Sequence, residues 1–136
     1  METNFSHVVK GDKPEDVYNT GAMRDNQIGK GRYDLISPIA LKRLAIHMEN
    51  GARRYADRNW EKGLPLNRYY DSAMRHMQRY LLDRMLGKDH EEDHLAAAMW
   101  NIHCLIHTEE MIGLGLLPDE LDNLPNLNHE DREENL

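Results

Sequence analysis

The chain has one cysteine, Cys104, among its 136 residues. A single cysteine excludes a disulfide framework and a zinc site built from several thiolates, and it predicts a reducing compartment. No stretch approaches the roughly 18 apolar residues of a membrane-spanning helix, and the first residues lack the apolar segment of a signal peptide. We therefore expect a cytoplasmic protein.

An excess of basic residues is also missing. The chain carries 24 acidic and 17 basic side chains, for a formal net charge of -7. Nucleic-acid polymers and membrane surfaces are bound through basic faces, so we expect neither as a partner. A small anionic ligand remains compatible, because a local cluster of Arg and Lys with a divalent metal can hold a triphosphate on an otherwise acidic protein.

Strand-like alternation and internal repeats are absent, which predicts an all-α fold, an antiparallel helical bundle. Ser37-Pro38 is a typical helix start, a second helix is expected over 67–86, and Asp89 with Glu92 has the capping-box pattern of a third. We divide the chain into an N-terminal arm, a helical domain and an acidic C-terminal tail, at 1–24, 25–117 and 118–136. The end of that tail, 129–136, is expected to be disordered.

The two long helices each have an apolar and a polar side. In the helix at 67–86 the expected core stripe is Tyr70, Ala73, Met74, Met77, Leu81 and Met85, and the opposite side carries Ser72, His76, Arg79 and Asp83. The next helix has apolar flanks formed by Leu95, Met99, Ile102 and Ile106 and by Ala97, Trp100 and Cys104. Between these flanks run Glu91, His94 and Asn101. Polar groups on a mostly buried helix must be satisfied by other residues or by a ligand, so this line is a candidate site wall.

Acidic and imidazole side chains are the candidate metal ligands. They are Glu49, Asp71, His76, Glu91, Glu92, Asp93 and His94. Carboxylates with some imidazole and no thiolate suit Mg²⁺ or Mn²⁺, which neutralise charge in phosphoryl transfer and lower the pKa of an attacking water. Two alternatives stay open: helix capping by Asp89 and Glu92, and an ordinary hydrogen-bonded role for His76.

Two further segments could bind a nucleotide. The glycine-spaced segment 25–34 carries Lys30 and Arg32, and its backbone can approach a phosphate, although its spacing is not that of a P-loop. The segment 51–63 combines arginines with aromatic residues, which suits phosphate and base together. Its candidates are Arg53, Arg54, Tyr55, Asn59 and Trp60. The alternatives are a connecting loop and a rim of solvated cations around packed aromatics.

Three motifs in this order carry a family resemblance. They are Gly51-Ala52-Arg53-Arg54-Tyr55 with Asn59-Trp60, Tyr70-Asp71-x-Ala73-x-Arg75-His76, and Glu92-Asp93-His94-Leu95-Ala96-Ala97 with Trp100-Asn101. Together they resemble the phage dATP/dGTP diphosphohydrolases, which are related to the MazG-like all-α nucleotide pyrophosphohydrolases. The resemblance covers about residues 20 to 110. The Glu-Glu-x-x-Glu motif of the MazG-like group is absent, and Glu91-x-x-His94 places an imidazole where that group has a carboxylate.

The resemblance implies hydrolysis of a purine deoxynucleoside triphosphate, dGTP or dATP, to the monophosphate and pyrophosphate with Mg²⁺ or Mn²⁺. It also implies a homodimer or homotetramer in the cytoplasm of a phage host, where some relatives supply dGMP for DNA that contains 2-aminoadenine. Catalysis is assigned to Glu92, Asp93, His94 and Glu49. Lys30, Arg32, Arg53, Arg54 and Arg75 are assigned to phosphate, Tyr55, Asn59 and Trp60 to the nucleoside, and Asn101 to a supporting hydrogen bond.

Two other functions compete with this interpretation. An HD-type phosphohydrolase would release tripolyphosphate or inorganic phosphate, but Asp93-His94 reverses the order of its His-Asp dipeptide. A non-enzymatic helical phage protein would bind a host partner through the leucines between 116 and 127, and the polar line would then be an internal hydrogen-bond network. Such a protein should show no melting shift with Mn²⁺ and nucleotide.

Overall fold

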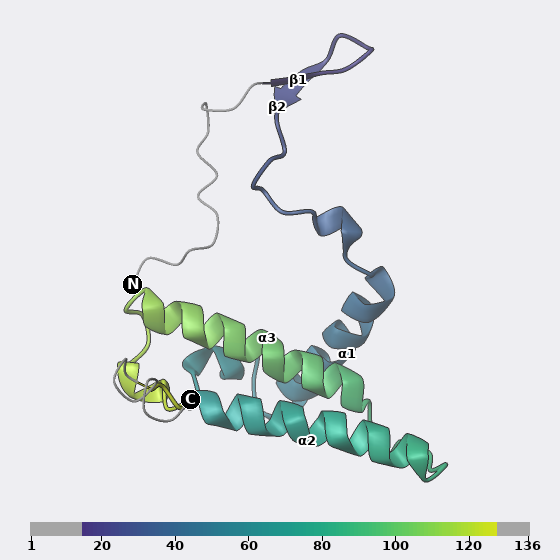
Figure 1. The fold of residues 1–136 in the computed structure, drawn as a ribbon, viewed down its shortest axis with the longest axis vertical. Helices are drawn as coiled ribbons and strands as arrows, with labels where there is room; N and C mark the ends of the chain where they lie inside the picture. Colours follow the sequence, from purple (N-terminus) through teal and green to yellow (C-terminus); the bar gives the residue numbers. More distant parts are fainter. Residues whose placement is uncertain (1–14, 128–136) are drawn as a thin grey trace.

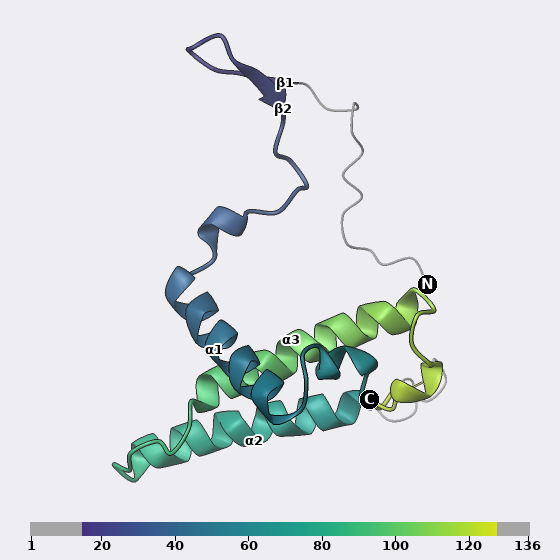
Figure 2. The same ribbon diagram turned by 180° about the vertical axis from the view of Figure 1, so that it is seen from behind.

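The computed structural model describes residues 15–127 and is mainly helical, which confirms the all-α prediction. The three α-helices are α1 (Pro38–Arg54), α2 (Leu66–Met85) and α3 (His94–Gly113). Short 3-10 helices are η1 (Tyr33–Leu35), η2 (Asn59–Lys62) and η3 (Asp119–Leu121). The antiparallel helices α2 and α3 lie side by side, and α1 packs against α3 (Figures 1 and 2).

The helix ends follow from local side chains and glycines. Ser37 accepts a hydrogen bond from the backbone N–H of Ala40 at 3.2 Å, and Pro38 fills the first position of α1, as the sequence predicts. α2 ends just before Gly87, whose φ of +62° suits a residue without a side chain. The first turn of α2 is capped from a distant segment, because Asn123 accepts a hydrogen bond from the N–H of Asn67 at 3.0 Å.

The inner face of α2 is not the one that its apolar pattern predicts. Leu66, Tyr69, Ala73 and Asp83 are buried, whereas the expected core stripe, apart from Ala73, is exposed. Four of its side chains, Tyr70, Met74, Met77 and Leu81, are each about half exposed, and Met85 is 74% exposed. The helix therefore turns its polar side, which includes His76 and Asp83, toward α3.

α3 buries one of its two predicted apolar flanks more than the other. Its buried residues include the small side chains of Ala97 and Cys104 together with His94 and Asn101. Ile102 and Ile106, expected in the core, are about half exposed. Asn101 donates a hydrogen bond to the backbone carbonyl of Ala97 at 2.9 Å, so its amide is used within the helix. The predicted line of polar groups is thus partly inside the contact between the two helices.

Two additions complete the fold. A small antiparallel hairpin of β1 (Glu15–Val17) and β2 (Met23–Asp25) projects from the helices in Figure 1, where the sequence predicted no strand. Strands of three exposed residues are too short to show an alternation.

After α3, part of the leucine-rich segment folds back and contacts the residues before α2. Leu121 and Leu117 lie so close to Gly63 that a Cβ added there would be 2.9 and 3.0 Å from them. The expected disordered end, 129–136, lies outside the described residues.

α3 begins later than the capping-box pattern predicted. Asp93, not Asp89, is its N-cap and accepts a hydrogen bond from the N–H of Ala96 at 3.0 Å. The same carboxylate accepts two hydrogen bonds from the guanidinium of Arg43 on α1, at 2.5 and 2.7 Å, and this guanidinium lowers the pKa of Asp93 to about 2.

Among the described residues, no helix combines the length and the apolar character that crossing a membrane requires.

Replacing Asp93 with alanine should lower the free energy of unfolding by about 1 kcal/mol, because it removes the cap. Because the folded pKa of Asp93 lies below its unfolded value of about 3.9, its contribution is present above that pH and is lost as pH falls toward about 2. Variant and wild type should therefore converge in acid. Urea unfolding followed by circular dichroism measures the difference.

Asp89→Ala is the matched control, since it removes an exposed carboxylate from the same connection. We expect it to change the free energy of unfolding by no more than about 0.5 kcal/mol. Equal losses in the two variants would contradict the assignment of the cap.

Candidate functional site

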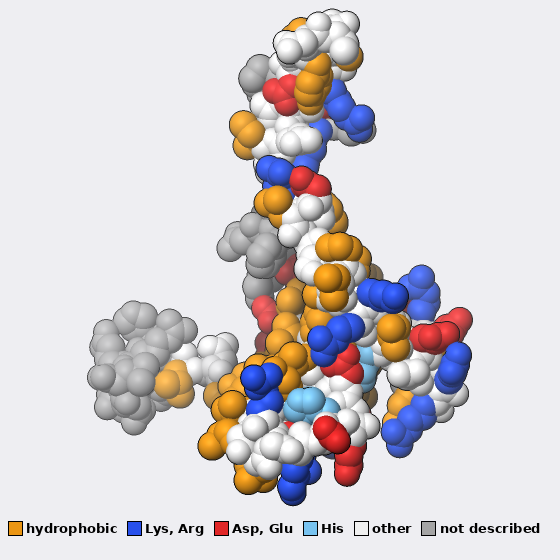
Figure 3. Space-filling model, turned by 90° about the vertical axis from the view of Figure 1, so that its right-hand side faces the viewer, with side chains coloured by type: hydrophobic (Ala, Val, Ile, Leu, Met, Phe, Trp, Pro, Cys, Tyr) orange, Lys and Arg blue, Asp and Glu red, His pale blue; other side chains and the backbone are white. Residues whose placement is uncertain are grey.

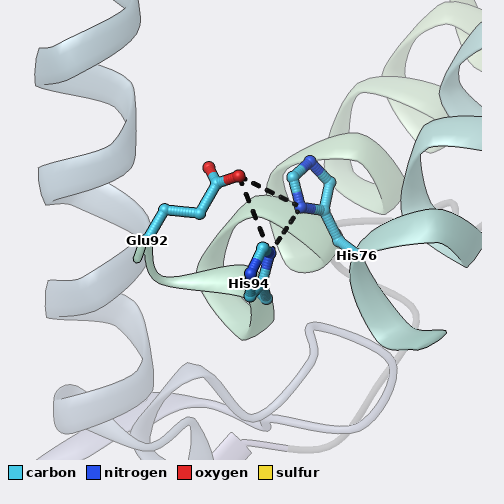
Figure 4. A group of neighbouring side chains, drawn as sticks. All are labelled: His76, Glu92 and His94. Atoms are coloured by element: carbon cyan, nitrogen blue, oxygen red, sulfur yellow. Dashed lines mark hydrogen bonds and ion pairs between the residues drawn. The ribbon is translucent and has the colours of Figure 1, made fainter. Parts of the chain in front are cut away.

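Two imidazoles and a carboxylate converge where α2 meets the start of α3. His76 Nδ1 and His94 Nδ1 are 3.0 Å apart. Glu92 Oε1 lies 3.7 Å from His94 Nδ1 and 4.0 Å from His76 Nδ1. Figure 4 shows the three side chains pointing toward one another from α2, from the connection and from α3. We call these three residues the His-His-Glu cluster.

The helix contact places these groups at different depths. The side chain of His94 is 8% exposed, that of His76 is 23% exposed, and that of Glu92 is 55% exposed. The imidazoles therefore lie on the inner side of the cluster, and the carboxylate lies on the side that faces solvent. In Figure 3, histidine side chains (pale blue) reach the surface between acidic (red) and basic (blue) groups. Glu92 and, in part, His76 therefore give the cluster a side that faces solvent.

A second group of ligand atoms shares His94. It consists of Asp83, His90 and His94, whose nearest side-chain donors lie within 4.8 Å of one another. Asp83 Oδ2 is 3.4 Å from His90 Nδ1 and 3.7 Å from His94 Nε2. The opposite ring nitrogen of His94, Nδ1, faces His76 and Glu92. His94 thus stands between two groups of side chains.

Burial sets the protonation of the nearby histidines. Desolvation lowers the pKa of His76, and the nearby Glu92 opposes this only in part. Desolvation also lowers the pKa of His47 on α1. A neutral imidazole offers a lone pair that a metal can use, whereas an imidazolium offers none. Two imidazole nitrogens and one carboxylate oxygen at these separations fit a divalent transition metal.

A pocket of about 880 Å³ lies between the end of α1, η2 and α3. Its walls include Tyr55, Trp60 and Trp100. Trp60 packs edge-on against His103 and His107 of α3, with ring centroids 4.9 and 4.8 Å apart. The pocket therefore has an aromatic surface, and the contacts with α3 hold its Trp60 side in place.

His47 connects this pocket with the His-His-Glu cluster. It lines the pocket and packs against Trp100, with ring centroids 5.6 Å apart. Glu92 acts to raise the pKa of His47, and His47 acts to lower the pKa of His76, so this ring is near the cluster. The cluster and the pocket are thus neighbouring parts of one candidate site.

The family model described as dATP/dGTP diphosphohydrolase, N-terminal, matches residues 20–113. The chain belongs to this family. No curated protein and no solved structure matches it significantly. The family assignment confirms the predicted resemblance, and all three motifs that carry the resemblance lie within the matched residues.

Of the metal ligands predicted for this diphosphohydrolase-family chain, the structure brings together His76, Glu92 and His94. The other predicted acids are not part of this cluster, although Glu49 lines the pocket described above. The carboxylates of Glu49 and Asp71 pair with arginines four residues later on their own helices, Arg53 and Arg75.

Two further predicted acids lie in the connection before α3. Glu91 is exposed and belongs to neither histidine group. Asp93 is engaged with Arg43 and with the start of α3.

The predicted substrate residues divide in the same way. Arg54, Tyr55, Asn59 and Trp60 line the pocket. The remaining ones do not line it, and they are Lys30, Arg32, Arg53, Arg75 and Asn101. Among these, Arg32 pairs with Asp34 through contacts of 2.7 and 2.8 Å in the segment before α1.

Sequence reasoning missed three residues near this site. Asp83 is on the same face of α2 as His76, and their spacing of two helical turns was a usable signal. His47 and His90 carry no such signal: His47 lies on α1, far from His76 in the sequence, and His90 lies in the connection before α3. Only the folded arrangement brings them to the site.

Proposed function

We propose that the chain is a metal-dependent cytoplasmic enzyme of purine nucleotide metabolism. It hydrolyses dGTP or dATP between the α and β phosphates and releases the deoxynucleoside monophosphate and pyrophosphate. The family description names this class of activity. The His-His-Glu cluster beside an aromatic pocket is the observation that carries the proposal for this chain.

His76, His94 and Glu92 would hold the metal ion. When bound, such an ion neutralises charge on phosphate oxygens and lowers the pKa of a water that attacks phosphorus. Two imidazole nitrogens with one carboxylate favour Mn²⁺ over Mg²⁺, because Mg²⁺ prefers an all-oxygen shell. The lowered pKa of His76 keeps its ring neutral and ready to bind.

The pocket would hold the nucleoside. Tyr55 and Trp60 offer aromatic faces for the purine, and Arg54 lies beside Tyr55 with its guanidinium carbon 5.3 Å from the ring centre. His47 lines the pocket and is near enough to Glu92 to be influenced by its charge, so we place the phosphates beside His47. The predicted phosphate contacts of Lys30, Arg32, Arg53 and Arg75 are kept as part of the proposal on the resemblance alone.

Turnover assays test the reaction directly. The protein is incubated with each of the four dNTPs and Mn²⁺ or Mg²⁺, and the products are separated by ion exchange. We expect dGMP or dAMP with pyrophosphate, and faster turnover with Mn²⁺. Release of deoxynucleoside with tripolyphosphate would instead show the HD-type reaction, and no turnover with any metal would contradict the proposal.

Alanine variants of His76, His94 and Glu92 should each abolish turnover while the helix content is preserved. Asp89→Ala, in the same connection as Glu92, is the matched control and should retain wild-type turnover. Wild-type turnover in the Glu92 variant would contradict the assignment of the cluster.

Tyr55→Ala should weaken nucleotide binding by about 1 kcal/mol or more, because it removes a stacking face. This corresponds to about a fivefold rise in KM with kcat nearly unchanged. Tyr18→Ala, which removes another exposed tyrosine outside the pocket, is the control. Equal KM values for both variants would place the base elsewhere.

A second copy of the chain would cover the exposed stripe of α2. Met74, Met77, Leu81 and Met85 form an apolar line that residues 15–127 leave about half exposed or more. Figure 3 shows hydrophobic side chains (orange) grouped along one side of the helices. Large exposed apolar areas are typical of oligomer contacts, so we propose a homodimer or homotetramer. A host partner for the leucine-rich segment is less favoured, since Leu117 and Leu121 pack on Gly63.

Sedimentation equilibrium tests this assembly. The wild type should sediment as a dimer or tetramer, and Met77→Glu should sediment as a monomer, because it places a charge in the apolar line. Gln27→Glu adds the same charge on an exposed residue outside the helices and should leave the mass unchanged. A monomeric wild type at micromolar concentration would contradict the proposal.

A further inference from the structure

Asp83 is a buried carboxylate in the contact between α2 and α3. Its side chain is only 3% exposed. Arg79 Nε lies 3.0 Å from Oδ1 but without hydrogen-bond geometry, so no side chain or backbone group among the described residues donates a hydrogen bond to that oxygen. Oδ2 faces His90 Nδ1 at 3.4 Å and His94 Nε2 at 3.7 Å. A carboxylate at this depth is costly unless it is paired and hydrogen-bonded, so its contacts with Arg79, His90 and His94 are what stabilise it.

The two nitrogens of His94 face different surroundings. Nδ1 is directed to His76 and Glu92, and Nε2 is directed to Asp83. A neutral imidazole carries one proton, so one nitrogen donates and the other offers a lone pair. Glu92 lies the same 3.7 Å from Nδ1 as Asp83 does from Nε2, but solvent screens the exposed Glu92 more than the buried Asp83. The proton is therefore favoured on Nε2, which leaves the lone pair on Nδ1. The 3.7 Å separation is longer than a hydrogen bond, and such contacts commonly shorten once a ligand is bound.

The group of Asp83, His90 and His94 could instead be a second metal site. The guanidinium of Arg79 argues against it, because a cation already 3.0 Å from the carboxylate repels a divalent ion on the same group. A single neutral His94 also has only one lone pair to give. The open side of the ring, beside the exposed Glu92, is therefore the better place for an ion.

We infer that Asp83 is a positioning residue that holds the proton of His94 on Nε2, so that Nδ1 is presented as a ligand beside His76 Nδ1 and Glu92. In the metal-free protein, His76 then donates from Nδ1 to His94 Nδ1 across their 3.0 Å separation. Carboxylate partners of this kind orient metal-binding histidines and commonly change metal affinity by about 10 to 100-fold. The role in metal binding rests on the proposed function, whereas the tautomer does not.

The tautomers are read from long-range ¹H–¹⁵N correlation spectra of the metal-free protein at alkaline pH. We expect His94 to carry its proton on Nε2 and His76 on Nδ1 in the wild type. Asp83→Asn keeps the shape but removes the charge, and it should produce a mixture of His94 tautomers. Glu109→Gln makes the same change on the exposed part of α3 and should leave both rings unaffected.

Mn²⁺ titration calorimetry supplies the second readout. Asp83→Asn should weaken binding by about 10 to 100-fold, and Glu109→Gln should not. A wild-type His94 with its proton on Nδ1 would overturn the inference even if the variant failed to fold. So would an Asp83→Asn variant with unchanged tautomer and Mn²⁺ affinity, or Mn²⁺ binding that Asp83→Asn abolishes and His76→Ala leaves intact.

The two proposals fail separately. If Mn²⁺ does not bind the wild type at all, the metal-dependent reaction is wrong, while the tautomer of His94 still decides the role of Asp83. If His76→Ala abolishes Mn²⁺ binding and Asp83→Asn changes neither readout, the proposed reaction stands and the inference is rejected.

Discussion

The close contact between α2 and α3 is the constraint on which the rest of the structure depends. Ala73 on α2 and Ala97 and Cys104 on α3 are small and buried, so the two helices can approach and leave room for larger polar groups along the same line. His76, His94 and Asp83 occupy that room. Their partial removal from water lowers the pKa of His76, and it makes every charge near them act more strongly.

The helices themselves were predictable because their signals are local. The proline start of α1, Gly87 after α2, and Gly113 and Gly115 at the end of α3 mark ends that depend on a few neighbouring residues. The inner face of α2 was not predictable in this way. An apolar pattern indicates the inner face only where a chain buries its most apolar side against itself. Met77 and Leu81 instead remain exposed, and the helix contact uses the side with Ala73, His76 and Asp83. An apolar helix face that contacts a second copy of a chain gives the same sequence pattern as a face that packs into the chain's own core.

The candidate site was predictable only in part. His76 and His94 were on the right helices, but their 3.0 Å separation depends on the register of α2 against α3, which no local pattern fixes. The acids posed a different problem, because composition does not distinguish a free carboxylate from a paired one. The four-residue spacing of Glu49 with Arg53 and of Asp71 with Arg75 was the available signal that these acids pair along their helices.

The central claim is that one buried imidazole, one partly buried imidazole and one exposed carboxylate form a metal centre. Anomalous diffraction from crystals soaked in Mn²⁺ tests it most directly. The account predicts a strong peak at ligand distance from His76 Nδ1, His94 Nδ1 and a carboxylate oxygen of Glu92. A peak held by Asp93, Glu49 or Asp71, with no density between the two histidines, would contradict it.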